Sequence, residues 1–220
     1  MRVSRNRYYG HPRLVQFIRE LGQQAQTGGF ADLYIGDLGQ PRGGPMLTGH
    51  ASHQIGLDAD IWFERQPGAR RSPADRENPR LRSLVKADDS GIDDSVFNEQ
   101  HVLLLRTAAQ MPNLDRIFVN KWIKQRLCQT TTGNRAWLNK LVVWVGHDEH
   151  FHVRLYCPPG NPNCQAQAGY YSLMTRTSGP QIRGGEAAAM VRVSTFPTDG
   201  QDDRFQVLAA IDWQNVVRFA

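Results

Sequence analysis

Two segments of the chain alternate strictly between apolar and polar residues, and this pattern limits how the chain can fold. In residues 56–63 three aliphatic residues alternate with Asp58 and Asp60, and in residues 150–156 His150 and His152 alternate with apolar residues. A period of two is typical of a β-strand that packs one face and presents the other. The sequence therefore predicts two strands, each with acidic or histidine side chains on its polar face.

The rest of the chain predicts helices, further strands and long loops. Apolar spacing and apolar runs predict helices at 11–27, 97–110 and 121–127, and strands at 30–35, 115–120 and 137–145. Residues 64–95 hold six arginines and several prolines, which indicates a long surface loop or insertion. The tail from Glu186 predicts a short helix and a strand. We expect one α+β domain over residues 1–220, with a small antiparallel sheet, flanking helices and long loops.

Composition excludes some classes of protein. The chain has 220 residues, 40% of them hydrophobic, so it is long enough to bury a core without metals or disulfides. It contains no run of about 18 apolar residues, which excludes an integral membrane helix. The net charge of +5 favours anionic partners without choosing among them. No nucleic-acid-binding pattern accompanies that charge, so we expect no nucleic-acid partner.

The cysteines and the N-terminus bear on the compartment. Cys157 and Cys164 bracket a segment rich in proline, glycine and asparagine, which favours a small disulfide loop and an oxidising compartment. Two unpaired thiols in a reducing cytosol are the alternative. Residues 1–9 carry the positive charge of a signal peptide without its apolar region. The chain is therefore either cytosolic or has lost its signal, with Met1 in its place.

The histidines form two clusters, which is the most informative functional feature. Five of the seven histidines lie in residues 50–53 and 147–152, next to carboxylates. Gly56 allows a sharp turn, so His53 and Asp60 can converge on one point. Because His150 and His152 are expected about 6–7 Å apart on one strand face, one can bind a metal while the other stands over a substrate.

Two histidines and one carboxylate suit a catalytic Zn²⁺ site that keeps a fourth position for water. Such an ion lowers the pKa of its water to about 7, which allows amide hydrolysis without a nucleophilic side chain. A non-haem Fe(II) oxygenase uses a similar ligand set and is a rival interpretation. The chain lacks the His-Glu-x-x-His, Gly-x-Ser-x-Gly and P-loop motifs, which excludes those classes of enzyme.

The spacing His53-x6-Asp60 followed by His150-x-His152 resembles the LAS group of zinc metallopeptidases. Longer motifs resemble the penicillin-insensitive murein endopeptidase family of that group. The motifs are Arg-Gly-Gly-Pro at 42–45, Gly-His-Ala-Ser-His-Gln-Ile-Gly-Leu-Asp-Ala-Asp-Ile-Trp at 49–62 and Gly-His-Asp-Glu-His-Phe-His-Val-Arg-Leu at 146–155. The likeness runs from about residue 11 to residue 185.

The resemblance implies a role for each of these residues. It implies that His53, Asp60 and His152 bind one zinc ion. It makes His150 the general base, or the partner of that base beside the metal-bound water, and His147 a catalytic residue that orients water or stabilises the oxyanion. His50 and Arg42 would line the site or bind substrate.

The resemblance also implies a substrate and a location. The substrate is cross-linked peptidoglycan, cut between D-alanine and meso-diaminopimelate by a metal-activated water, in the periplasm. Cys157 and Cys164 match the family's short disulfide loop, whereas Cys128 has lost the partner expected in the family. The alternatives are a D-Ala-D-Ala carboxypeptidase or dipeptidase of the same group, and a non-catalytic cell-wall-binding module with a structural metal.

Overall fold

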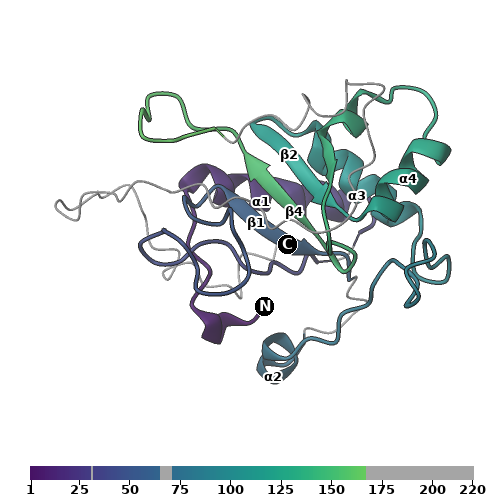
Figure 1. The fold of residues 1–220 in the computed structure, drawn as a ribbon, viewed down its shortest axis with the longest axis horizontal. Coiled ribbons are helices and arrows are strands. Elements are labelled where there is room, and N and C mark those ends of the chain that lie inside the picture. The colour runs from purple at the N-terminus through teal and green to yellow at the C-terminus, as the bar shows by residue number, and fades with distance from the viewer. Residues whose placement is uncertain (31, 65–70, 167–220) are drawn as a thin grey trace, which may run out of the picture.

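A computed structural model describes residues 1–30, 32–64 and 71–166 (Figure 1). The helices are α1 (Pro12–Thr27), α2 (Pro73–Glu77), α3 (Glu99–Gln110) and α4 (Lys121–Thr130), with 3₁₀ turns η1 (Val3–Arg5) and η2 (Ala136–Lys140). The strands are β1 (Asp58–Trp62), β2 (Leu114–Val119), β3 (Leu141–Val143) and β4 (His150–Leu155). The expected α+β class is confirmed, and the helix and strand predicted from Glu186 onward lie outside the described residues.

The sheet has four strands in the order β1-β4-β2-β3. Strand β4 pairs antiparallel with both β1 and β2, whereas β2 and β3 are parallel. The expectation of an antiparallel sheet is therefore wrong for its last pair. A parallel pair needs a crossover connection, and α4 with η2 supplies it between β2 and β3.

Helix α1 forms where the sequence predicts it, because its apolar residues repeat at helical spacing. Leu14, Phe17 and Leu21 are buried along one side of the helix. His11 caps its start, since the His11 Nδ1 accepts a hydrogen bond from the backbone N–H of Arg13 at 3.1 Å. Helices α1 and α3 contact each other and lie behind the sheet in Figure 1. They cover one face of the sheet and leave the other to the site.

The two sheet faces differ as the alternation predicts. Side chains of one face join the hydrophobic core; they are Ala59 and Ile61 of β1, Ile117 and Val119 of β2, and Phe151 and Val153 of β4. The other face carries Asp58, Asp60, His152 and Arg154, and these polar side chains are buried as well. Buried charges need partners within the protein, so we expect each charged side chain on this face to contact another polar side chain.

Three predicted segments differ in detail from the expectation. Among the described residues of segment 30–35, Ile35 forms an isolated β-bridge with Ile61 and no strand is present. Residues 137–145 begin as the 3₁₀ turn η2 before the short β3. The expected surface loop over residues 64–95 contains α2, and its Leu84, Val85 and Ile92 are buried in the core.

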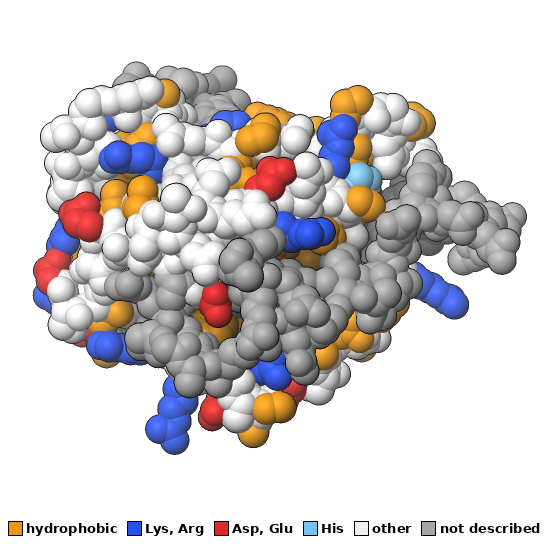
Figure 2. Space-filling model, turned by 180° about the vertical axis from the view of Figure 1, so that it is seen from behind, with side chains coloured by type: hydrophobic (Ala, Val, Ile, Leu, Met, Phe, Trp, Pro, Cys, Tyr) orange, Lys and Arg blue, Asp and Glu red, His pale blue; other side chains and the backbone are white. Residues whose placement is uncertain are grey.

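The cysteines and the surface complete the fold. Cys157 and Cys164 form the predicted disulfide, and Cys128, which is half-buried, is a free thiol. Figure 2 shows the side opposite to Figure 1, where the described Lys and Arg side chains lie singly among other types. No basic patch covers the described part of that side. Among the residues described, no helix is long and apolar enough to cross a membrane.

Candidate metal centre

The register of β1 and β4 places the polar side chains in opposed pairs. On the face away from α1 and α3, Asp60 lies opposite His152, and Trp62 lies opposite His150. On β2 the partner of His152 is Phe118, so an aromatic ring stands beside it, with ring centroids 5.1 Å apart. The alternation of each strand thus becomes a shared surface of carboxylate and imidazole groups.

The loop before β1 brings a third imidazole to Asp60. His53 is completely buried, and its Nδ1 lies 2.5 Å from the carbonyl oxygen of Leu38. The loop can return to β1 because Gly56 has a φ of +70°, and a Cβ there would lie 2.9 Å from the His11 nitrogen. The predicted convergence of His53 and Asp60 at a glycine turn is therefore what the structure contains.

Asp60 lies at the centre of four histidines. Its Oδ1 is 3.3 Å from His53 Nε2, 3.7 Å from His150 Nε2 and 3.8 Å from His152 Nδ1. Its Oδ2 is 3.3 Å from His50 Nε2. Burial alone would raise the pKa of Asp60, but the charge of His53 and, to a lesser extent, the charges of His150 and His152 hold it far below its usual range. The carboxylate therefore stays ionised.

Two buried acceptors face each other in this cluster. Because the Nδ1–H of His53 donates to the Leu38 carbonyl, its Nε2 carries a lone pair, which points at Asp60 Oδ1. Neither atom has a hydrogen-bond partner among the described residues. Buried polar atoms are rarely left unsatisfied, and ligand atoms of a tetrahedral zinc lie about 3.3 Å apart. The pair therefore fits a metal ion held between Nε2 and Oδ1.

Protonation can satisfy the same pair when no metal is bound. Burial acts to lower the pKa of His53, but the adjacent Asp60 carboxylate outweighs it and raises the pKa. A proton and a metal ion therefore compete for the same place.

Two further imidazoles can complete a metal site. His50, His53 and Asp60 have ligand atoms that all lie within 4.8 Å of one another, so this group could hold an ion. However, His50 Nε2 also lies 3.0 Å from Asp37 Oδ2, which gives that nitrogen a proton to donate. His152 turns its Nδ1 to Asp60. Whether His50 or His152 is the third ligand, imidazole nitrogens and a carboxylate oxygen would bind the ion.

His147 and His150 lie at the outer side of the cluster, with ring centroids 4.9 Å apart. Burial and the neighbouring His150 lower the pKa of His147 to about 4. Burial also lowers the pKa of His150, although the charge of Asp60 opposes this. Both imidazoles are therefore neutral near pH 7, which is the state a proton acceptor requires.

A cavity of about 580 Å³ opens beside these histidines. Its lining residues are Gly49, His50, Ala51, Ser52, Arg116, Phe118, Trp144, Val145, Gly146, His147, His150 and His152. Trp144 and Val145 are also exposed, so the cavity has an apolar rim next to a polar floor. A cavity of this size can hold a peptide segment against the imidazoles.

Comparisons with known proteins identify the family of the chain. A family model described as penicillin-insensitive murein endopeptidase matches residues 1–174. The chain belongs to the penicillin-insensitive murein endopeptidase family. The predicted resemblance is therefore confirmed.

Named murein endopeptidases of several bacteria are similar in sequence to this chain. The penicillin-insensitive murein endopeptidase of Haemophilus influenzae is 47% identical over 170 residues, which are 76% of this chain and 58% of that protein. The one of Klebsiella pneumoniae subsp. pneumoniae is 43% identical over 168 residues, and the one of Salmonella heidelberg 44% over 167; each match covers 76% of this chain and 61% of the relative. The chain thus spans between 58% and 61% of the length of these relatives.

Most of the residues that the sequence marks as candidate site residues are brought together. His50, His53, Asp60, His147, His150 and His152 all lie within one cluster. Arg42 is exposed and is not among the residues that line the cavity, so its part in substrate binding stays a prediction.

Sequence reasoning assigned no role to two buried carboxylates. Asp37 accepts a hydrogen bond from His50, and Asp58 accepts one from His152 Nε2 at 2.8 Å. The position of Asp58, two residues before Asp60 on the same strand face, was the available signal. Asp37 lies in a loop, and no pattern in the sequence pointed to it.

Proposed function

We propose that this chain is a zinc peptidase that hydrolyses D-alanyl–meso-diaminopimelate cross-links of peptidoglycan. The observation that carries the proposal is the buried pair of acceptors, His53 Nε2 and Asp60 Oδ1, among four histidines in a murein endopeptidase family member. The names of the relatives support murein as the substrate. The choice of bond within murein comes from the motifs at 49–62 and 146–155.

We assign the zinc ligands as His53 Nε2, one oxygen of Asp60, and His152 Nδ1. The opposed register of Asp60 and His152 and the lone pair of His53 support this set. Two neutral nitrogens and one carboxylate leave room for water and substrate. When bound, the zinc ion supplies a Lewis acid and lowers the pKa of water to about 7.

The chain's own residues handle the protons. His150 Nε2, 3.7 Å from Asp60 Oδ1 and on the cavity side, accepts the proton of the attacking water and returns it to the leaving amine nitrogen. The lowered pKa of His150 keeps that nitrogen free to accept. His147 Nδ1 lies 3.0 Å from the Val145 carbonyl, which leaves its Nε2 as an acceptor that orients the water.

Other residues bind and align the substrate. His50 donates its Nε2 proton to Asp37, which fixes the imidazole ring where it lines the cavity. The apolar rim at Trp144 supports the peptide, and Arg42 meets an anionic part of the cell wall. The disulfide Cys157–Cys164 and the wall substrate together support a periplasmic location.

Hydrolysis of cross-linked muropeptide dimers tests the proposal. Purified protein should convert dimers to monomers, a chelator should stop the reaction, and added zinc should restore it. Release of free D-alanine without monomers would instead assign a carboxypeptidase. Full zinc occupancy with no cleavage of either substrate would assign a wall-binding module with a structural metal.

Metal analysis of single variants tests the ligand set. His152→Ala should lose zinc on dialysis, whereas His50→Ala should keep it. The reverse pattern would assign the ion to His50, His53 and Asp60 and would overturn the assignment of His152.

A further inference from the structure

Asp58 is a buried carboxylate that the proposed chemistry leaves without a role. It is 0% exposed, and each of its oxygens has one close partner. Oδ1 lies 2.8 Å from His152 Nε2, and Oδ2 lies 2.7 Å from Arg154 Nη1. A buried charge is costly unless it is paired and hydrogen-bonded, and here both conditions are met by two specific side chains.

The contact with Asp58 determines which nitrogen of His152 carries the proton. A carboxylate whose other oxygen is held by a guanidinium is an acceptor, so the facing Nε2 of His152 must donate. In a neutral imidazole the remaining nitrogen then has a lone pair. That nitrogen is Nδ1, and it faces Asp60 Oδ1 at 3.8 Å.

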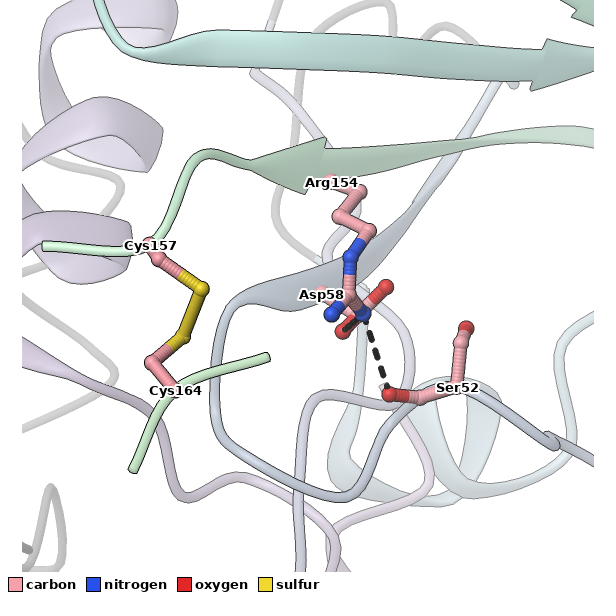
Figure 3. The surroundings of a disulfide bond; sticks show 5 residues. All are labelled: Ser52, Asp58, Arg154, Cys157 and Cys164. Carbon is pink, nitrogen blue, oxygen red and sulfur yellow. Dashed lines mark hydrogen bonds and ion pairs between the residues drawn. A yellow bond between two sulfur atoms is a disulfide. The ribbon is translucent and has the colours of Figure 1, made fainter. Parts of the chain in front are cut away.

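Arg154 fixes the carboxylate itself. It lies directly across from Asp58 in the register of β1 and β4, so the strand pairing sets their approach. Figure 3 shows its side chain extending from β4 toward Asp58 and the backbone of Ser52, whose carbonyl oxygen lies 3.4 Å from Arg154 Nη1. The same guanidinium therefore ties the loop that carries His53 to the strand that carries His152.

We propose that Asp58 and Arg154 are a positioning pair for the metal centre. They hold His152 as the Nε2–H tautomer and aim its Nδ1 at the ion. Carboxylates hydrogen-bonded to metal-binding histidines act in this way in other sites. The inference rests on the proposed function, because it takes His152 as a zinc ligand.

Asp37 provides a matched comparison within the same cluster. It is also a buried aspartate bonded to a histidine, but it contacts His50 Nε2, the nitrogen that itself faces Asp60 at 3.3 Å. Its hydrogen bond therefore does not free a nitrogen for the ion. Removing the two carboxylates one at a time should affect zinc binding unequally.

The test measures zinc affinity by competition with a chromophoric chelator, on the full chain. Asp58→Asn keeps the shape of the side chain and should weaken zinc binding by about 10- to 100-fold, as is usual when such a partner is lost. Asp37→Asn should leave the affinity within about threefold of wild type. Equal affinity of Asp58→Asn and wild type, with His152→Ala unable to hold zinc, would overturn the inference and leave the proposed function standing. Zinc retained by His152→Ala would overturn the ligand assignment, and the inference with it.

Two further measurements guard against a variant that does not fold. Asp58→Asn leaves the buried Arg154 charge without its carboxylate, so the double variant Asp58→Leu/Arg154→Met removes both charges and leaves no acceptor for His152 Nε2. It should unfold cooperatively and show the same loss of zinc affinity; wild-type affinity in a folded double variant would refute the positioning role. Nitrogen-15 NMR of the metal-free wild type should show His152 protonated at Nε2. Protonation at Nδ1 instead would also overturn the inference.

Discussion

Replacing His150 by alanine should separate catalysis from metal binding. His150 Nε2 lies 3.7 Å from Asp60, and the ligands assigned to zinc are His53, Asp60 and His152. The variant should therefore keep its zinc. It should lose the group that moves the proton between water and the leaving amine.

The size of each effect follows from the surroundings of His150. A general base contributes about 10²- to 10⁴-fold to a rate. That corresponds to roughly 3–5.5 kcal/mol of barrier, since each tenfold is about 1.4 kcal/mol. The side chain is 20% exposed, and its ring packs on Trp62 with centroids 5.0 Å apart. Losing one aromatic pair costs about 0.5–1.5 kcal/mol of stability. The increase in the activation barrier should therefore be larger than the decrease in the free energy of unfolding.

The assay compares three quantities: initial rate on muropeptide dimers, zinc content after dialysis, and the midpoint of chemical unfolding. His11→Ser is the control, because serine can also cap α1 and His11 lies outside the histidine cluster. It should match wild type in rate and zinc content. A His150→Ala enzyme that keeps its zinc and turns over at the wild-type rate would refute the role of general base.

Three other measurements test the site and the fold. In the metal-free protein the pKa of His147 is lowered to about 4 from an unfolded value of 6.5, so the stability it contributes is present above pH 6.5 and is lost as the pH falls toward 4; its NMR titration should have a midpoint near 4, not near 6.5. Phe151→Ala should lower the free energy of unfolding by about 3–5 kcal/mol, because the ring is completely buried against Phe63, and a denaturant midpoint close to wild type would contradict that packing. Replacing Cys157 and Cys164 by serine opens a loop with a sequence separation of 7 and should cost about 2.5 kcal/mol by loop entropy, which thermal unfolding under oxidising conditions would detect.

The sequence predicted those helices and strands whose formation depends on a local pattern of apolar residues. The apolar period of α1 and the alternation of β1 and β4 are local, and the structure contains all three elements close to the predicted bounds. The disulfide followed from the short, turn-rich segment between Cys157 and Cys164. Each prediction used neighbours within a few residues.

Features that depend on distant contacts were missed. The parallel pairing of β3 with β2 depends on how α4 and η2 cross over, and the sequence of β3 alone does not show its direction. Residues 84 and 85 have a hydrophobic character that fits a core, but the surrounding arginines and prolines dominated the prediction of a surface loop. Whether apolar residues in a loop are buried depends on which other segments pack against them, and the local sequence does not show this.

The two aspartates of β1 show what the local pattern predicts and what depends on strand register. Period two places Asp58 and Asp60 on one face, and by that criterion either could be the ligand. Their partners differ only because β4 runs antiparallel in one register: Asp60 meets His152, and Asp58 meets Arg154. A shift of one residue would turn the histidines of β4 to the core face. A carboxylate opposite an arginine has its charge already paired, whereas a carboxylate opposite an imidazole and beside the lone pair of His53 has a place for a cation. Under the proposed ligand set, the strand register therefore gives one aspartate to the metal and the other to the histidine proposed to bind it.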